Sequence, residues 1–228
     1  MEPQRLNKFL ALQLGISRRQ ADDLISAGKV WLNGEKAELG ARFVEADEIR
    51  VGDKIISTSE QTKTYLLFNK PRGYVCSRKK QGENETIYVI LPKKYRHLKP
   101  VGRLDKDSSG LILLTNDGDF AFRMTHPKFR KIKEYLVKVD QPLAPLHQQM
   151  IADFGVDLPD GKSQLGLERL DDSRQFWRVS MSEGRNRQIR RTFAVVGYEV
   201  QELHRTVFGA YRLPETLTEG EFREVEAK

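Results

Sequence analysis

The polar run from Ser57 to Thr62 divides the chain into two parts of very different length. The run holds no apolar anchor, and this composition is typical of linkers between domains. A chain of 228 residues is long enough for a small module joined to a medium-sized domain. We therefore expect one domain over residues 1–60 and a second over residues 61–228.

The composition of the chain is that of a soluble globular protein. Hydrophobic residues make up 39% of it and charged residues 31%, unlike the composition of disordered chains. No stretch approaches the roughly 20 apolar residues that a membrane-spanning helix requires. The N-terminus also lacks the apolar core of a secretion signal. We therefore expect a cytoplasmic protein without a membrane partner.

Several kinds of cofactor chemistry have no counterpart in the sequence. Cys76 is the only cysteine, which excludes an internal disulfide and a cysteine-cluster metal site. The phosphate-binding loop, the dinucleotide-binding glycine pattern and the His-Glu-x-x-His zinc motif are all missing. Four histidines are scattered without ligand spacing: His97, His126, His147 and His204. We expect no metal and no cofactor, so any catalysis has to come from carboxylates, arginines and hydroxyls.

The net charge of +7 is unevenly distributed along the chain. Residues 1–60 contain 9 Lys and Arg against 10 Asp and Glu, whereas residues 61–228 contain 30 against 22. An excess of positive charge indicates a polyanionic partner, most often nucleic acid. Basic proteins with other partners are also common, so the charge alone does not decide between them.

Residues 1–60 carry the pattern of two helices followed by short strands. Ser17 stands three residues before Gln20, which predicts a capping box at the start of the second helix. The first helix is indicated by apolar residues at helical spacing: Leu6, Phe9, Leu10 and Leu14. A strand, a tight turn and a closing strand are expected at Val30–Leu32, Asn33-Gly34 and Val51–Ile56.

The basic residues of this module have two interpretations. They are Arg5, Lys8, Arg18, Arg19 and Lys29. Solvated helix faces would explain them without any partner. The module also resembles the S4 RNA-binding domain, on the segments Arg5–Leu10, Ser17–Ala21, Leu24–Val30, Leu32–Gly34 and Val51–Ile55. The resemblance implies that the two helices present these five residues to structured RNA, which they recognise by its shape and phosphates.

The second part mixes strand and helix patterns. Apolar runs predict strands at Tyr65–Phe68, Leu111–Thr115, Glu134–Val139 and Trp177–Met181. Helices are indicated near Leu143–Phe154 and Arg187–Val196. Because the strands and helices do not alternate regularly, we expect an α+β fold with a mostly antiparallel mixed sheet.

Two polar segments of the second part are long enough to carry a site. The first is Gly102–Gly110, which leads into a buried strand and could aim a side chain into a cleft. The second is Glu183–Arg191, which leads into a helix with the apolar face Ile189, Phe193 and Val196. Arg187 and Arg191 point away from that face, while Arg190 lies at its flank and can pair with an inward-facing carboxylate. Ordinary charged turns would share this spacing.

Four segments together resemble the motifs of the RsuA-type pseudouridine synthases. They follow the family's order over residues 64–213 and are Asn69–Gly73, Gly102–Gly118, Lys133–Val137 and Glu183–Arg191. The resemblance implies an enzyme that isomerises uridine to pseudouridine in RNA after turning the nucleotide out of its stack. It also implies ribosomal RNA as the partner and a monomeric protein. Members of the family modify large-subunit, small-subunit and occasionally transfer RNA, and we favour the large subunit on the general character of the chain, because no single residue decides.

The same resemblance assigns roles to four residues. Asp105 is implied as the nucleophile that attacks the ribose or the base, so that the bond between C1′ and N1 breaks. Arg103 is implied to hold the flipped-out nucleotide or the gap that it leaves. Tyr135 is implied to stack on the uracil and help remove the C5 proton, and Arg190 to pair with Asp105. Asp107, two residues further on, is the alternative nucleophile.

Other interpretations remain open at this point. The first is a non-catalytic RNA-binding or ribosome-assembly protein with the same fold, which the module and the charge would equally fit. A small-molecule hydrolase would need a second carboxylate in a suitable position, and the sequence offers no convincing one. Lys70 and Pro71 are expected to shape a turn rather than perform chemistry. Leu203 is expected to lie in the core, with packing near the pocket as the alternative.

Overall fold

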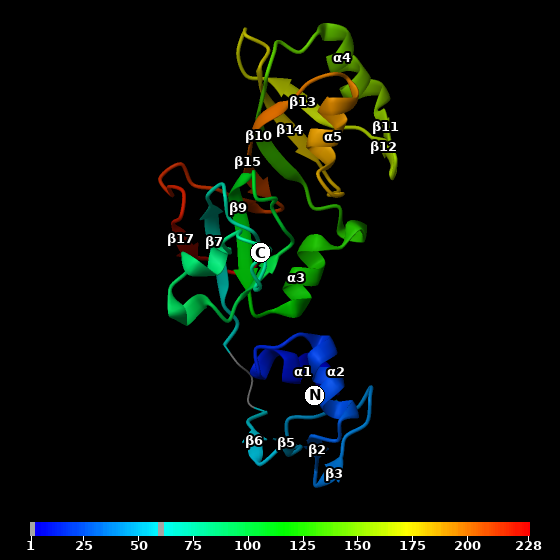
Figure 1. The fold of residues 1–228 in the computed structure, drawn as a ribbon, viewed down its shortest axis with the longest axis vertical. Coiled ribbons are helices and arrows are strands. Elements are labelled where there is room, and N and C mark those ends of the chain that lie inside the picture. The colour runs from blue at the N-terminus through cyan, green and yellow to red at the C-terminus, as the bar shows by residue number, and fades with distance from the viewer. Residues whose placement is uncertain (1–2, 59–61) are drawn as a thin grey trace. The chain divides into compact units, whose positions relative to one another are not determined.

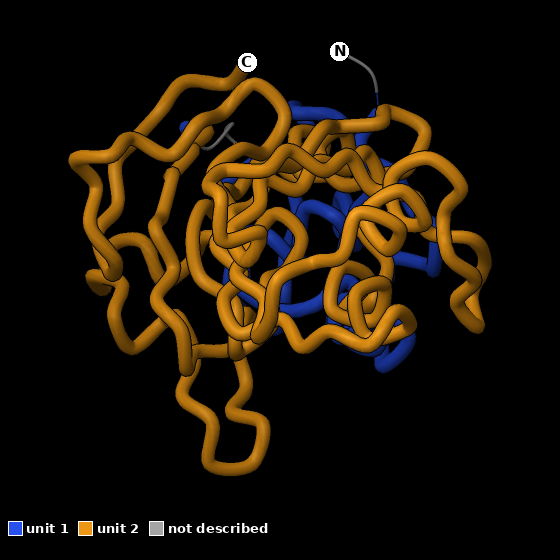
Figure 2. Tube along the Cα trace, turned by 90° about the horizontal axis from the view of Figure 1, so that it is seen from above, with its two compact units in different colours: residues 1–62 blue, residues 63–228 orange. Residues whose placement is uncertain are grey.

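The computed structural model describes residues 3–58 and 62–228. The chain forms two compact units, Met1–Thr62 and Lys63–Lys228 (Figure 2). The division falls two residues beyond the end of the domain expected over residues 1–60. Part of the predicted linker, residues 59–61, lies outside the described residues.

Unit 1 packs two helices against a short sheet (Figure 1). Helix α1 spans Leu6–Gln13 and helix α2 spans Arg18–Ser26. The predicted capping box is present, because the hydroxyl of Ser17 accepts a hydrogen bond from the amide of Gln20, whose side chain accepts one from the amide of Ser17. The core of the unit includes Leu6, Leu10, Ala21, Ile25, Val30 and Ile49.

The strands of unit 1 are short and antiparallel. Strands β2 and β3 form the predicted hairpin, with Asn33 and Gly34 at φ 52° and 85°, as a two-residue turn of this type requires. The single closing strand expected over Val51–Ile56 is wrong, because Gly52 turns the chain at φ 58° and splits the segment into two paired strands. The strands are β1 Gln4–Arg5, β2 Val30–Leu32, β3 Glu35–Lys36, β4 Arg42–Phe43, β5 Ile49–Val51 and β6 Lys54–Ile56.

Unit 2 is built on one large mixed sheet, in agreement with the predicted α+β class. Its strand order is β13-β14-β10-β15-β9-β7-β17, with β16 beside β15 and β8 beside β9. The described pairs in this sheet are antiparallel except for β15 with β9. The strands are β7 Tyr65–Lys70, β8 Lys99–Val101, β9 Ser109–Thr115, β10 Lys133–Val139, β13 Gly166–Arg169, β14 Phe176–Met181, β15 Val200–Phe208, β16 Tyr211–Arg212 and β17 Phe222–Glu224. Strands β11 Val156–Leu158 and β12 Gly161–Ser163 form a separate hairpin.

Helical segments of unit 2 flank the sheet (Figure 1). The helix expected near Leu143–Phe154 is α4, Pro145–Gln149, continued by the π-helical turn η4, Met150–Phe154. Helix α5 spans Gln188–Val195 and α3 spans Gly118–Thr125. Three short 3-10 turns are η1 Ile87–Val89, η2 Lys93–Tyr95 and η3 Pro127–Phe129. Among the described residues, no helix combines the length and apolar character that crossing a bilayer demands.

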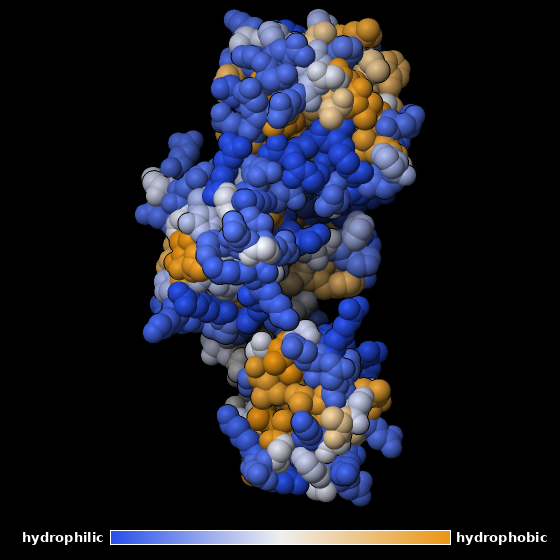
Figure 3. All heavy atoms as spheres, in the orientation of Figure 1, coloured by the Kyte–Doolittle hydropathy of each residue, from blue (hydrophilic) through white to orange (hydrophobic). Residues whose placement is uncertain are grey.

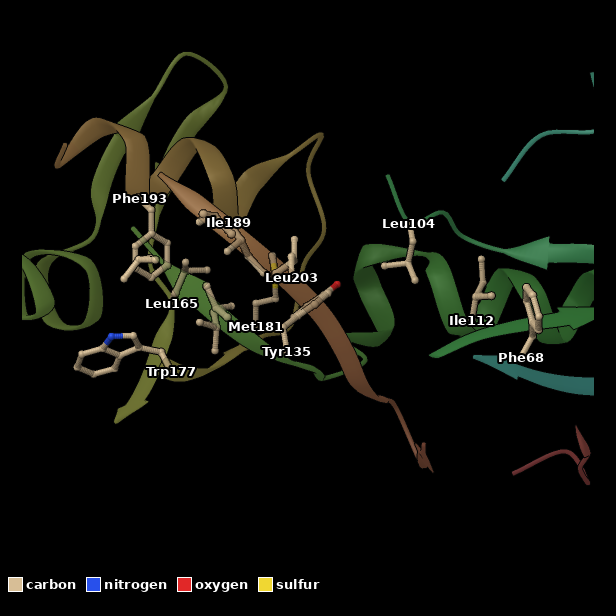
Figure 4. Close-up of a cluster of buried hydrophobic side chains, with 14 of the residues drawn as sticks. Phe68, Leu104, Ile112, Tyr135, Leu165, Trp177, Met181, Ile189, Phe193 and Leu203 are labelled. Atoms are coloured by element: carbon tan, nitrogen blue, oxygen red, sulfur yellow. The ribbon is translucent and has the colours of Figure 1, made fainter. Parts of the chain in front are cut away.

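The main core of unit 2 runs along one face of the sheet (Figure 4). Trp177 and Phe193 lie at one end of this cluster, and Phe68 and Ile112 lie at the other. Tyr135 stands between the two ends and points its hydroxyl toward the side where Leu104 lies. The core therefore continues from one end of the sheet to the other past Tyr135.

Candidate active site

The loop between β8 and β9 carries Asp105. The backbone of this loop is held by Lys70, the last residue of β7, whose side chain is fully buried. The Lys70 ammonium donates to the carbonyl oxygens of Pro71, Asp105 and Ser108 at 2.9, 3.2 and 2.6 Å. Burial lowers the pKa of Lys70 to about 8. This lysine and its neighbours thus fix the backbone that presents Asp105, a role that the sequence analysis did not assign to it.

A close approach of two strands brings the far half of the sheet to this loop. Strand β15 runs parallel to β9, with Arg205 opposite Gly110. A Cβ atom on Gly110 would lie 2.3 Å from the carbonyl oxygen of Arg205, and the residue has φ +102°. Only glycine lets the strands meet here. As a result, Leu203 and Arg205 of β15 reach the same cleft as Asp105.

Tyr135 enters the cleft from the neighbouring strand. It pairs with Val179 of β14 and Arg205 of β15, and it is 7% exposed. The alternation that predicts half-buried strands is confirmed, since Val137 and Val139 are buried on the same face of β10. Tyr135 is therefore a core residue whose polar tip reaches the cleft, the arrangement that tyrosine favours when one end is apolar and the other wet.

Arg187, and not Arg190, makes the ion pair with Asp105. The Arg187 guanidinium lies 3.8 Å from the carboxylate of Asp105 and 3.5 Å from that of Asp107. Arg190 instead donates to two backbone carbonyls, those of Val200 and, at 3.1 Å, Asp107. The expected pairing of Arg190 with Asp105 is therefore corrected.

The reason lies in the backbone before α5. Arg187 has left-handed dihedral angles, φ 46° and ψ 32°, and precedes the first helical residue, Gln188. The helical spacing that placed Arg187 away from the apolar face does not apply to it. Arg190 lies inside the helix at the flank of the apolar face, as expected. Its guanidinium, however, donates hydrogen bonds to the start of β15 and to the loop that carries Asp107, and so connects the two.

Asp105, Tyr135 and Arg187 line one cleft of about 300 Å³ together with Leu203 and Arg205. Asp105 lines it, with a side chain 32% exposed, whereas Asp107 is not among its lining residues. The cleft has acidic lining only at Asp105 and Glu183 among the described residues. Six basic residues also line it: Arg103, Lys131, Lys133, Arg185, Arg187 and Arg205. This lining suits an anionic molecule with one polar group placed beside Asp105.

Arg205 is the deepest of these cations. It is 2% exposed, and its Nε donates to the carbonyl oxygen of Leu111 at 2.7 Å. Its Nη2 has no hydrogen-bond partner in the described part of the chain, and neither has the hydroxyl of Ser108, which also lines the cleft. A buried charge is costly when it is unpaired. The alternation of Leu203, Arg205 and Val207 along β15 was the sequence signal that could have placed this arginine on the buried face.

The other predicted substrate residue, Arg103, also reaches the cleft. It lies two residues before Asp105 in the same loop and is exposed. No salt bridge of Arg103 occurs among the described residues, and groups of His, Cys, Asp and Glu suited to a metal ion are likewise missing from that part of the chain. Three of the predicted site residues thus line one cleft: Asp105, Arg103 and Tyr135. Arg190 does not line it and instead donates to the backbone carbonyl of Asp107 in the adjoining loop.

The basic residues predicted for RNA contact lie on the surface of unit 1. Lys8 is on α1, and Arg18 and Arg19 begin α2. Arg5 precedes the first helix and Lys29 follows the second. All five side chains are exposed, and Arg18 also donates to the side chain of Asn7 at 3.2 Å. Exposed cations on two helices of a small domain can contact phosphates, and the geometry of the unit allows this use.

Comparison with known proteins gives this geometry a family. A model described as RNA pseudouridylate synthase matches residues 64–195, and one described as S4 domain matches residues 4–49. The chain is 37% identical to "Ribosomal small subunit pseudouridine synthase A" of Yersinia pestis, covering 96% of this chain and 93% of that protein. It is 35% identical to "Ribosomal large subunit pseudouridine synthase B" of Bacillus subtilis, covering 92% and 87%.

A solved structure agrees over almost the whole length. The structure titled "Crystal structure of pseudouridylate synthase" has a TM-score of 0.70 and 36% sequence identity, and the match covers 98% of this chain and 96% of that one. The family match includes the loop of Asp105, the strand of Tyr135 and the start of α5. The chain therefore belongs to the RNA pseudouridine synthase family and carries an S4 domain at its N-terminus.

Proposed function

We propose that this chain converts uridine to pseudouridine in ribosomal RNA, with Asp105 as the nucleophile. The observation that carries the proposal is the cleft itself, because Asp105 lines it together with Tyr135 and six basic residues while Asp107 does not. A carboxylate in a cationic cleft is suited to attack a nucleotide that the cations have already bound.

The reaction needs one carboxylate and no cofactor. Asp105 attacks the ribose or the base, the bond between C1′ and N1 breaks, and the uracil leaves with its negative charge delocalised onto its carbonyls. The base turns, C5 bonds to C1′, the bond that Asp105 formed breaks and frees its carboxylate, the C5 proton leaves and N1 takes up a proton, so the product has the same composition as the substrate. Tyr135 stacks on the uracil and helps remove the C5 proton, and Arg103 holds the flipped-out nucleotide.

Arginines position the reacting groups. Arg187 pairs with the carboxylate of Asp105 and holds it in the cleft. Arg190 acts through the backbone of Asp107 and is a positioning residue. We assign the unpartnered Nη2 of Arg205 to a substrate oxygen, either a phosphate or a uracil carbonyl, because this would pair the buried cation. Turning the nucleotide out costs a few kcal/mol, which contacts of this kind offset.

The nucleophile is tested by Asp105→Asn with Asp107→Asn as the matched control. The substrate is unmodified ribosomal RNA labelled with tritium at C5 of its uridines, and tritium released to water reports the loss of the C5 proton. We expect no release above background from Asp105→Asn, with RNA binding largely retained, and clear release from Asp107→Asn. Undiminished tritium release from Asp105→Asn would refute the assignment of Asp105 as the nucleophile.

The choice of ribosomal RNA rests on the S4 domain and on the names of the relatives. These names include both ribosomal subunits at similar identity. We retain the large subunit as the favoured target, and we place the protein in the cytoplasm as a monomer. Transcribed large-subunit and small-subunit RNA, offered separately in the tritium assay, test the preference: product from the small-subunit RNA alone would overturn it.

A further inference from the structure

Helix α3 and the turn η3 expose aromatic side chains beside the cleft. Helix α3 buries Phe120 and Met124, whereas Phe122 points to the other side and is 47% exposed. Phe129 in η3 is 37% exposed, and its ring centroid lies 5.9 Å from that of Phe122. The ring of His126 lies 4.7 Å from Phe122. We call Phe122, His126 and Phe129 the aromatic patch; Figure 3 shows apolar side chains gathered over α3 beside a strongly hydrophilic face.

The segment that carries the aromatic patch is strongly basic. From residue 120 to residue 133 the chain holds no acidic residue and five basic ones, Arg123, Lys128, Arg130, Lys131 and Lys133. The Lys128 ammonium lies 5.3 Å from the ring centroid of Phe122 and 4.8 Å from that of Phe129. None of the ion pairs among the described residues involves Arg123, Lys128 or Arg130. The surface therefore fits a partner that has both negative charge and flat apolar faces.

The aromatic patch continues into the cleft. His126, Pro127 and Lys131 belong to the same segment and line the cleft that holds Asp105. An RNA strand whose nucleotide enters the cleft therefore passes close to these rings. Within a duplex both faces of a base are covered, so only an unpaired base can stack on a protein ring.

We propose that the aromatic patch binds an unpaired base of the RNA next to the target nucleotide. The base stacks on Phe122 or Phe129, while Lys128 and Arg130 contact the adjoining phosphates. This inference rests on the proposed function in so far as RNA enters the cleft. It adds a preference that the chemistry does not require: the nucleotides flanking the target are single-stranded when the enzyme binds them.

The test uses the full chain and a ten-nucleotide strand of 5-iodouridine, which crosslinks under light to aromatic side chains on which it stacks. We expect crosslinks within residues 122–129. The double variant Phe122→Ala and Phe129→Ala should lose these crosslinks and bind the strand about fivefold or more weakly, as the loss of one stacked base implies. A double variant to Tyr at the same positions keeps the rings and should bind like the unaltered chain.

The controls separate stacking from charge and from folding. Phe154→Ala removes another exposed phenylalanine, 62% exposed in η4 and outside the cleft lining, and should leave the affinity unchanged. Circular dichroism checks that each variant folds. Crosslinks confined to other residues, or an alanine double variant that binds as tightly as the unaltered chain, would overturn the inference. So would displacement of the strand by a glutamate decapeptide at equal concentration, because the surface would then suit an acidic protein.

The outcome is independent of the reaction. Tritium release from ribosomal RNA by the unaltered chain tests the proposed function, while the affinity for the short strand tests the aromatic patch. Release without any effect of the double variant refutes the patch alone. Binding that depends on the patch, without release, refutes the proposed function alone.

Discussion

Replacing Lys70 with Met removes the ammonium that holds the loop of Asp105. The carbonyl oxygens of Pro71 and Ser108 then lose their donor, whereas that of Asp105 keeps a hydrogen bond from the amide of Ser108 at 3.1 Å. A buried acceptor without a partner costs about 1–3 kcal/mol, so the loss amounts to roughly 2–6 kcal/mol. The opposing term is the charge itself, because a pKa lowered from 10.5 to about 8 means that burying the ammonium costs about 3 kcal/mol. We expect Lys70→Met to lower the free energy of unfolding at pH 7 by about 1 kcal/mol, the middle of the net range.

The pH dependence of the stability loss in Lys70→Met tests the role of Lys70 more sharply than the magnitude of the loss at pH 7 does. Between pH 8 and pH 10.5 the unfolded state keeps the proton on Lys70 while the folded state has lost it. The unfolded state therefore binds more protons, and the stability of the unaltered chain rises with pH in this window by up to about 3 kcal/mol. The Met variant has no such group. The difference in stability between the two proteins should consequently widen from pH 8 to pH 10.5.

The assay is urea unfolding followed by tryptophan fluorescence. Trp31 lies in unit 1 and the buried Trp177 in unit 2. Trp31→Phe, introduced into both the unaltered chain and the Lys70→Met variant, therefore makes the fluorescence report on unit 2. The difference between the two curves cancels other groups that titrate at high pH, such as Tyr65, whose pKa burial raises to about 12. Parallel pH profiles, or an unchanged unfolding midpoint at pH 7, would refute the role given to Lys70.

Three further changes test the elements around the cleft. Gly110→Ala places a methyl group against the backbone of Arg205, and we expect a loss of about 3 kcal/mol or more in urea unfolding. Asp117→Ala removes the side chain that caps α3 and should cost about 1 kcal/mol at pH 7. Burial works to raise the pKa of Asp117, but hydrogen bonds from the amide of Phe120 and the hydroxyl of Tyr65 outweigh it and lower that pKa. The cost of Asp117→Ala should therefore shrink as the pH falls through this lowered pKa, and a cost that stays constant in acid would contradict the assignment. Arg187→Ala removes the ion pair with Asp105; tritium release should slow by about tenfold or more, with little change in unfolding because the side chain is 43% exposed.

Local patterns in the sequence predicted those elements whose cause is local. Residues 135, 137 and 139 alternate toward the core because a strand has a period of two, and the structure confirms it. Asn33 and Gly34 form the predicted hairpin turn because both adopt positive φ readily. Helix α3 was missed because Asp117 and Gly118 look like a turn. The aspartate instead accepts hydrogen bonds from the amides of Asp119 and Phe120 and begins a helix.

Contacts between distant segments account for what the sequence could not predict. Lys70 reaches a loop 35 residues further along the chain, and Gly110 meets a strand almost a hundred residues away. Neither residue carries a local signal for these partners. The motif resemblance gathered the right segments into one site, but it did not give the hydrogen bonds that hold them there.

The two arginines at the start of α5 show where reasoning from periodicity fails. A helical phase assigns directions only to residues whose dihedral angles are helical. Arg187 lies one residue before that region, and its left-handed conformation costs about 1 kcal/mol for a residue with a side chain. In this conformation its guanidinium lies 3.8 Å from the carboxylate of Asp105 and 3.5 Å from that of Asp107. The strained residue is therefore a cation that pairs with the proposed nucleophile, and local strain of this kind is expected where a fold sets the geometry of its site.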